Sequence, residues 1–132
     1  MGADLYLVSE FEEQHEKWPA SRRRRQKNMK LLTEELRRLL PMSSVETGDD
    51  PTIYAKFFTP DAGWTWYVAS GEPDGDDFVF FGYVVGVCGE WGGFRLSELM
   101  EVRGKLGLPV ERDRHFTAGR FSEVVPEWHR EA

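Results

Sequence analysis

The segment 57–94 constrains the fold most strongly, because it holds 11 of the 18 aromatic residues in a chain of 132. Its aromatic and β-branched runs are interrupted by glycine, proline and aspartate, which is typical of an antiparallel sheet. The pattern predicts four strands, at 52–58, 64–69, 78–87 and 90–96. Short connectors between neighbouring strands favour hairpins. Because the run from 78 to 85 is apolar on both faces, we expect that strand to be central and covered on both sides.

Two helices are predicted outside this block. A long one spans 21–40, from Ser21 as N-cap to Pro41, and a short one spans 97–104. The long helix has one apolar stripe, formed at three- and four-residue steps by Met29, Leu32, Leu36, Leu39 and Leu40. The predicted fold is therefore α+β: an antiparallel meander of four or five strands, with the long N-terminal helix packed on one face and the short second helix at an end.

The length fits one domain. We expect an N-terminal extension at 1–28, a single α+β domain at 29–125 and a tail at 126–132. No apolar run approaches the roughly 18 residues that cross a bilayer, and the first residues lack the pattern of a secretory signal. The single cysteine, Cys88, excludes an internal disulfide and fits the reducing cytoplasm. We expect its side chain to be a buried small hydrophobe and the protein to be cytoplasmic.

Charge divides the chain into a basic helix and an acidic body. Residues 22–40 carry eight basic side chains against two acidic ones, whereas residues 41–132 carry eight against sixteen. An acidic body disfavours non-specific binding to DNA and suits docking on a basic protein surface. The helix offers a nucleic-acid-binding candidate, although a solvated face explains the same charges more simply. That candidate consists of Arg22, Arg23, Arg24, Arg25, Lys27 and Lys30.

Four stretches carry a family resemblance. They are MKLLTEELRRLLP from Met29, YAKFFTPDAGWTWYVASGEP from Tyr54, FVFFGYVVG from Phe78 and LSELMEVRGKLGLPVERDRHF from Leu96. In this order they resemble the domain of unknown function 2958, over residues 29–125. That family is found in bacterial plasmids, integrated conjugative elements and phages, so the resemblance implies an accessory protein of a mobile genetic element and implies no reaction. The connector 70–77 looks shorter than is usual in the family, and residues 1–28 lie outside the resemblance.

The densest polar cluster lies after Pro109. In an extended segment Glu111, Asp113 and His115 point to one side, and two carboxylates beside a histidine suit acid–base chemistry or metal binding. The alternative is an edge strand whose charges block mispairing. The histidines and Cys88 fall at no metal-ligand spacing, and no phosphate loop or nucleophile motif occurs, so we expect no metal and no cofactor.

Trp64, Trp66 and Tyr67 suggest a stacking surface, but such surfaces place aromatic rings beside Arg and Lys. Lys56 is the only basic residue between Pro41 and Gly93. A packed core pair of tryptophans is therefore the favoured interpretation.

The leading hypothesis is a non-enzymatic accessory protein of a mobile element that binds a host or element-encoded protein. An anti-restriction or anti-CRISPR inhibitor is one version, in which carboxylates take the place of phosphates. The candidate contacts are Asp49, Asp50, Glu72, Asp74, Asp76 and Asp77.

Two alternatives stay open: nucleic-acid binding by the basic helix, and a hydrolase or transferase that uses Glu111, Asp113 and His115. A cleft that joins Trp64 or Trp66 to residues 111–115 would favour the enzyme. Buried tryptophans and an edge strand would disfavour it. The oligomeric state is not given by the sequence.

Overall fold

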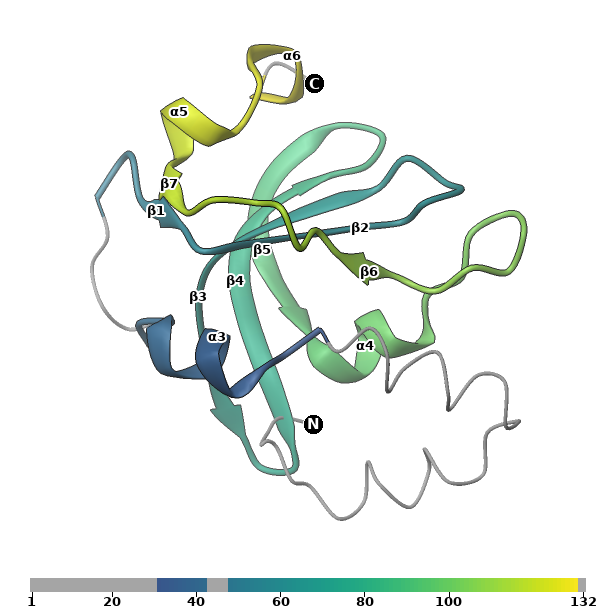
Figure 1. Ribbon diagram of the computed structural model, residues 1–132, viewed down its shortest axis with the longest axis horizontal. Helices are drawn as coiled ribbons and strands as arrows, with labels where there is room; N and C mark the ends of the chain where they lie inside the picture. Colours follow the sequence, from purple (N-terminus) through teal and green to yellow (C-terminus); the bar gives the residue numbers. More distant parts are fainter. Residues whose placement is uncertain (1–30, 43–47, 131–132) are drawn as a thin grey trace.

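The computed structural model describes residues 31–42 and 48–130 (Figure 1). Its helices and strands are α3 (Glu34–Leu39), β1 (Thr52–Ile53), β2 (Ala55–Phe58), β3 (Thr65–Asp74), β4 (Asp77–Val85), β5 (Gly89–Arg95), α4 (Leu96–Glu101), β6 (Glu111–Arg112), β7 (Gly119–Arg120), α5 (Phe121–Val124) and α6 (Glu127–Arg130). The predicted α+β class and the antiparallel sheet are confirmed.

The main sheet has five antiparallel strands in the order β5-β4-β3-β2-β6. Strands β2 to β5 form the predicted meander, and β6 returns after α4 to pair with the outer side of β2. The predicted strand 52–58 is divided at Tyr54: β1 pairs with β7 in a separate two-stranded sheet, and β2 pairs with β3 and β6. A local pattern cannot show this division, because it depends on pairing with β7 and β6, which lie far away in the chain.

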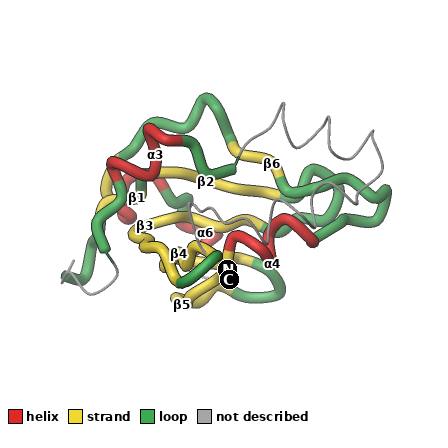
Figure 2. The backbone as a smooth tube through the Cα atoms, turned by 90° about the horizontal axis from the view of Figure 1, so that it is seen from below, coloured by secondary structure: helices red, strands yellow, loops and turns green. Residues whose placement is uncertain are grey.

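Both faces of the sheet are covered, as expected for a central strand that is apolar on both sides. On β3, Trp66 and Val68 belong to a core cluster that includes Leu36 of α3 and Leu99 of α4. Tyr67 and its neighbours on the opposite face belong to a second cluster with residues of α5. Figure 1 shows α3 and α4 on one side of the sheet and α5 and α6 on the other, and Figure 2 looks onto the α3–α4 side.

The prediction of one long helix over 21–40 is wrong in the part that the structure describes. Thr33 has an extended backbone (φ −89°, ψ 163°), and its side chain accepts a hydrogen bond of 3.0 Å from the Leu36 N–H. A threonine hydroxyl satisfies this otherwise unpaired donor at a helix start, so α3 begins at Glu34. Residues 21–30 lie outside the described ranges. The second helix also differs from the prediction, since α4 spans Leu96–Glu101.

The acidic connector predicted at 70–77 is mostly strand. The pairing register of β3 and β4 shifts between Val68 and Ser70. Beyond this bulge the two strands stay paired as far as the last residue of β3, Asp74, and the first residue of β4, Asp77. Only Gly75, with φ +60°, and Asp76 lie between them. A bulge resets the alternation of faces, so the sequence no longer shows a regular strand pattern.

Cys88 is exposed, which corrects the prediction that its side chain is buried. It lies in the turn between β4 and β5, beside Val87, whose side chain is 95% exposed. The apolar run of β4 ends at Val85, and the turn carries the next residues away from both faces of the sheet.

Candidate functional site

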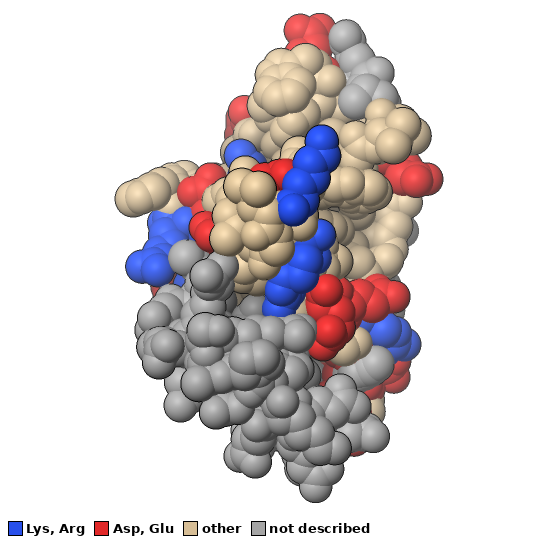
Figure 3. Space-filling model, turned by 90° about the vertical axis from the view of Figure 1, so that its right-hand side faces the viewer, with Lys and Arg blue, Asp and Glu red and all other residues tan. Residues whose placement is uncertain are grey.

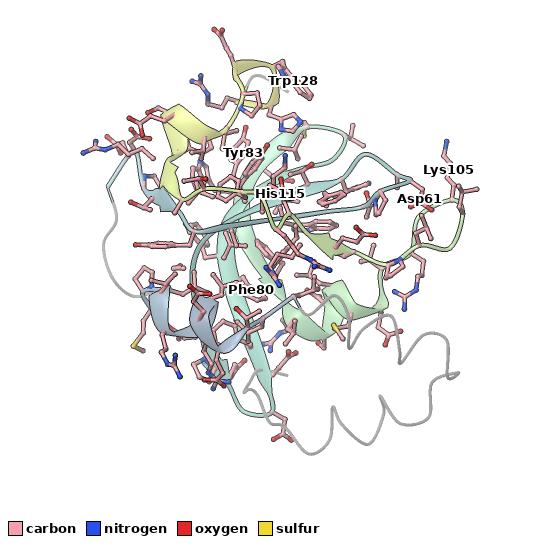
Figure 4. All side chains as sticks on the ribbon, in the orientation of Figure 1. Asp61, Phe80, Tyr83, Lys105, His115 and Trp128 are labelled. Atoms are coloured by element: carbon pink, nitrogen blue, oxygen red, sulfur yellow. The ribbon has the colours of Figure 1, made fainter. Side chains whose placement is uncertain are left out.

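A groove of about 750 Å³ lies beside the edge strand β6. Four parts of the chain line it: β2, the segment 59–67, the segment 111–115 and the C-terminal segment 126–129. Figure 4 labels His115, on the segment after β6, and Trp128, on α6. The groove therefore combines an edge of the sheet with the C-terminal helix, which falls in the part of the chain predicted to be a tail.

A tyrosine–histidine pair forms part of the groove wall. Tyr67 is fully buried, and its hydroxyl lies 2.7 Å from Nδ1 of His129. Burial, assisted by the Asp113 carboxylate, raises the pKa of Tyr67 to about 12. Burial, assisted by Lys56, lowers the pKa of His129. Both groups are therefore neutral near pH 7, and the direction of their hydrogen bond depends on which ring nitrogen of His129 carries the proton.

An ion pair lies next to this tyrosine. Lys56 Nζ is 3.9 Å from Asp113 Oδ2 and 5.9 Å from the centre of the Tyr67 ring. The backbone N–H of Asp113 donates to the Lys56 carbonyl at 2.9 Å, and the backbone N–H of His115 donates to Asp113 Oδ1 at 2.9 Å. Asp113 thus fixes the turn that follows β6 and balances the charge of the lysine.

The predicted acid–base residues Glu111, Asp113 and His115 all line the groove, together with Trp64. The structure therefore contains the cleft that would favour an enzyme. It also contains the features that would disfavour one, since β6 is an edge strand and Trp66 is buried. In the described residues no hydrogen bond or ion pair joins the His115 ring to either carboxylate.

Two exposed tryptophans flank the groove. Trp64 is 42% exposed and stacks on the buried Trp66 at 6.1 Å, and Trp128 is 70% exposed. Of the expected core pair, Trp66 is therefore in the core and Trp64 lies at the surface. Neither Trp128 nor the contact of Tyr67 with His129 is among the features that the sequence predicts for a site. The contact spans 62 residues, and no local pattern signals it.

Three of the six candidate acidic contacts hold the fold together. Asp50 accepts hydrogen bonds from the Ser122 backbone N–H at 2.8 Å and hydroxyl at 2.7 Å, and these bonds lower its pKa. Asp74 lies 2.7 Å from the guanidinium of Arg95. Asp77 is only 2% exposed, so its carboxylate is not a surface group.

The remaining three acids lie at the surface. Asp49 and Asp76 are exposed, and Glu72 is half-buried. The face drawn in Figure 3 shows basic and acidic side chains in small groups close to one another, without a continuous acidic area. The basic candidates from Arg22 to Lys30 lie outside the described residues, so their role stays a prediction.

Within residues 31–42 and 48–130, no three His, Cys, Asp or Glu side chains are grouped so as to hold a metal ion. The helices in these ranges are all too short or too polar to cross a membrane.

A family model described as a protein of unknown function, DUF2958, matches residues 29–131. The chain belongs to the DUF2958 family. All four segments that line the groove lie inside the DUF2958 region, and so does α6. Comparisons with curated proteins and with solved structures found no match to this chain.

Proposed function

We propose that the protein acts by binding and not by catalysis, and that its groove receives an extended segment of a partner protein. The observation that carries this proposal is the pair of exposed tryptophans, Trp64 and Trp128, on one groove. Tryptophan dominates the binding energy of many protein interfaces, and grooves lined by aromatic rings are a common site for extended peptides.

The charges of the groove suit a peptide better than a nucleic acid. Glu111 and Asp113 line the groove beside Arg112 and Arg114, so its wall carries both signs of charge, and the ammonium group of Lys56 is already paired with Asp113. A peptide carries charges of both signs and backbone groups that match such a mixed lining.

We further propose that the partner is a host or element-encoded protein and that the chain is an accessory protein of a mobile genetic element. The family resemblance supports this role, and inhibition of a restriction or CRISPR-type nuclease is one version. The groove is a better contact surface than the acidic set, because Asp50, Asp74 and Asp77 are engaged within the fold.

Selection from a displayed random-peptide library tests the proposal. The full chain is immobilised, and the selected peptides are measured by fluorescence anisotropy against the wild type, Trp64→Ala and Trp128→Ala. We expect each alanine variant to bind at least about tenfold more weakly. Leu106→Ala is the matched control, since it removes another exposed apolar side chain outside the groove. Failure to select any peptide, or equal binding by all four proteins, would contradict the proposal.

One observation favours a second candidate, a hydrolase or transferase: Glu111, Asp113 and His115 share the groove. The selected peptides also test this alternative. If the protein only binds, mass spectrometry recovers each peptide unchanged after prolonged incubation. Cleavage or modification of a peptide that is lost in His115→Ala, with thermal stability unchanged, would establish the enzyme instead.

A further inference from the structure

The two edges of the main sheet are constructed differently. The β6 edge is two residues long, consists of Glu111 and Arg112, and is followed at once by a turn. Short length and charge are the usual protection of an edge against pairing with another strand. The β5 edge is seven residues long, and its register with β4 is continuous, without a bulge. It contains no proline, and its centre carries no charge.

An aromatic surface adjoins this unprotected edge. Phe81 of β4 and Trp91 of β5 stack at 6.0 Å, and each is 38% exposed. Trp91 also contacts Tyr83 and Phe121, so its ring position is fixed by the second core cluster. In the described part of the chain no strand pairs with the outer side of β5, which lies at one end of the strand order in Figure 2.

The centre of β5 has no side chains. Gly92 and Gly93 follow Trp91. A Cβ atom at Gly92 would meet no atom within 4 Å, and one at Gly93, on the face of Trp91, would meet only the Phe80 carbonyl oxygen, at 3.6 Å. On the β4 side, Gly93 pairs with Phe81 and Trp91 pairs with Tyr83. The strand thus presents an aromatic ring and, two residues away on the same face, a gap of the kind that an aromatic ring fills.

We propose that the β5 edge pairs with the β5 edge of a second copy of this chain, in an antiparallel arrangement whose two-fold axis passes through Gly92. Residues that lie opposite each other in an antiparallel pair have side chains on the same face of the sheet, and neighbouring residues in a strand have side chains on opposite faces. The two-fold axis must therefore lie between two copies of the same residue, because an axis midway between two successive residues would pair side chains from opposite faces. An axis at Gly92 places Trp91 of each copy opposite Gly93 of the other. The backbone groups of both edges are then satisfied in one continuous ten-stranded sheet.

The neighbouring register fits less well. An axis at Gly93 would place Trp91 opposite Arg95, whose guanidinium is held by Asp74 at 2.7 Å and lies 3.7 Å from Asp77. The Gly92 register leaves this ion-pair group intact. It also makes the two Trp91 rings diagonal neighbours on one face, within reach of each other.

Sedimentation velocity of the full chain, from low to high micromolar concentration, tests the association. We expect a species of twice the 15.3 kDa chain mass. Gly93→Lys places a charge opposite Trp91 in the partner and should raise the dimer dissociation constant at least about tenfold. Ala118→Lys makes the same charge change at another exposed position and should leave the constant unchanged. Circular dichroism checks that each variant is folded. A monomer at every concentration, or a dimer indifferent to Gly93→Lys, would overturn the proposal.

Cross-linking tests the register. In a Cys88→Ser background, Gly92→Cys places the two thiols directly opposite each other, at a separation that a disulfide spans. Glu90→Cys, an exposed position on the same strand, places its thiols four residues out of register. We expect a covalent dimer from the first variant and none from the second under mild oxidation. A covalent dimer from Glu90→Cys alone would overturn the proposed axis.

Discussion

The carboxylate of Asp61, in the loop between β2 and β3, holds the loop after α4 in which Gly104 lies. Asp61 Oδ2 accepts hydrogen bonds from the backbone N–H groups of Leu106 at 2.6 Å and Leu108 at 3.4 Å. A Cβ atom at Gly104 would overlap the Asp61 carboxylate, which explains a glycine where φ is not positive. Figure 4 shows the two loops next to each other, marked by Asp61 and Lys105.

We therefore predict that Gly104→Ala lowers the free energy of unfolding by about 2 kcal/mol, measured by urea denaturation. In an Asp61→Ala background the carboxylate that a side chain at position 104 would overlap is absent. Gly104→Ala should therefore lower the free energy of unfolding by clearly less than it does in the wild type. A double-mutant cycle measures this difference. Equal costs in the two backgrounds would show that the carboxylate is not what excludes a side chain at position 104.

Tyr67 gives the stability a specific dependence on alkaline pH. Its pKa is about 12 in the folded protein and about 10 in the unfolded chain, so the folded state retains the phenol proton longer. The resulting stabilisation is complete below pH 10 and is lost as the pH rises toward 12. At pH 11 the expected loss is about 1.4 kcal/mol relative to pH 8. Urea denaturation should show this loss in the wild type beyond any loss in Tyr67→Phe, and identical pH profiles would contradict it.

At the scale of elements, one buried carboxylate connects β4 to α4. The Asp77 carboxylate accepts hydrogen bonds from the backbone N–H groups of Phe78 at 2.8 Å and Ser97 at 3.1 Å. It also accepts one from the Ser97 hydroxyl. We predict that Asp77→Ala lowers the free energy of unfolding by about 3 kcal/mol, since several buried donors lose their acceptor. Asp76→Ala removes the adjacent exposed carboxylate and should change it by less than about 0.5 kcal/mol. Comparable losses would exclude the connecting role of Asp77.

The sequence predicts those elements whose partners are near in the chain. The meander from β2 to β5 follows from hairpins, each of which joins consecutive strands. The pairing of Phe57 with Arg112 does not follow from the sequence, because the two residues are 55 positions apart and no local pattern signals contact over that distance. The start of α3 at Glu34 does not follow from the apolar stripe for another reason: the stripe includes Leu32, which is buried without being helical.

The candidate site shows the same division. The polar segment 111–115 could be recognised from its composition, and it does line the groove. Near Trp64 in the sequence, Lys56 is the only basic residue between Pro41 and Gly93, which disfavours a stacking surface for nucleic acid. Arg112 and Arg114 reach the same groove from β6 and the turn after it, and His129 reaches it from α6. Chemistry assembled from distant segments becomes visible only once the strand order is known.

At the scale of the whole molecule, the basic segment Arg22–Arg25 still predicts an affinity for nucleic acid. If the segment binds phosphates, the affinity for a mixed-sequence DNA duplex falls steeply with salt concentration. Replacement of the four arginines by alanine should reduce the slope of log K against log salt by about 3 to 4. Electrophoretic mobility shift at several salt concentrations measures it. No shift of the DNA at low salt would remove this alternative.

The groove reaches across β6, β2 and the first residues of β3, and the β5 edge lies beyond β4 at the other end of the five-stranded sheet. Substitutions at distant sites without shared partners act additively. We therefore predict that Trp64→Ala leaves the dimer dissociation constant unchanged and that Gly93→Lys leaves peptide affinity unchanged. Sedimentation velocity with and without a selected peptide measures the coupling directly. A change of more than about threefold in the dimer dissociation constant or in the peptide affinity would contradict this prediction and would mean that the two sites are coupled. Coupling between two sites is reciprocal, so both constants should then change by the same factor.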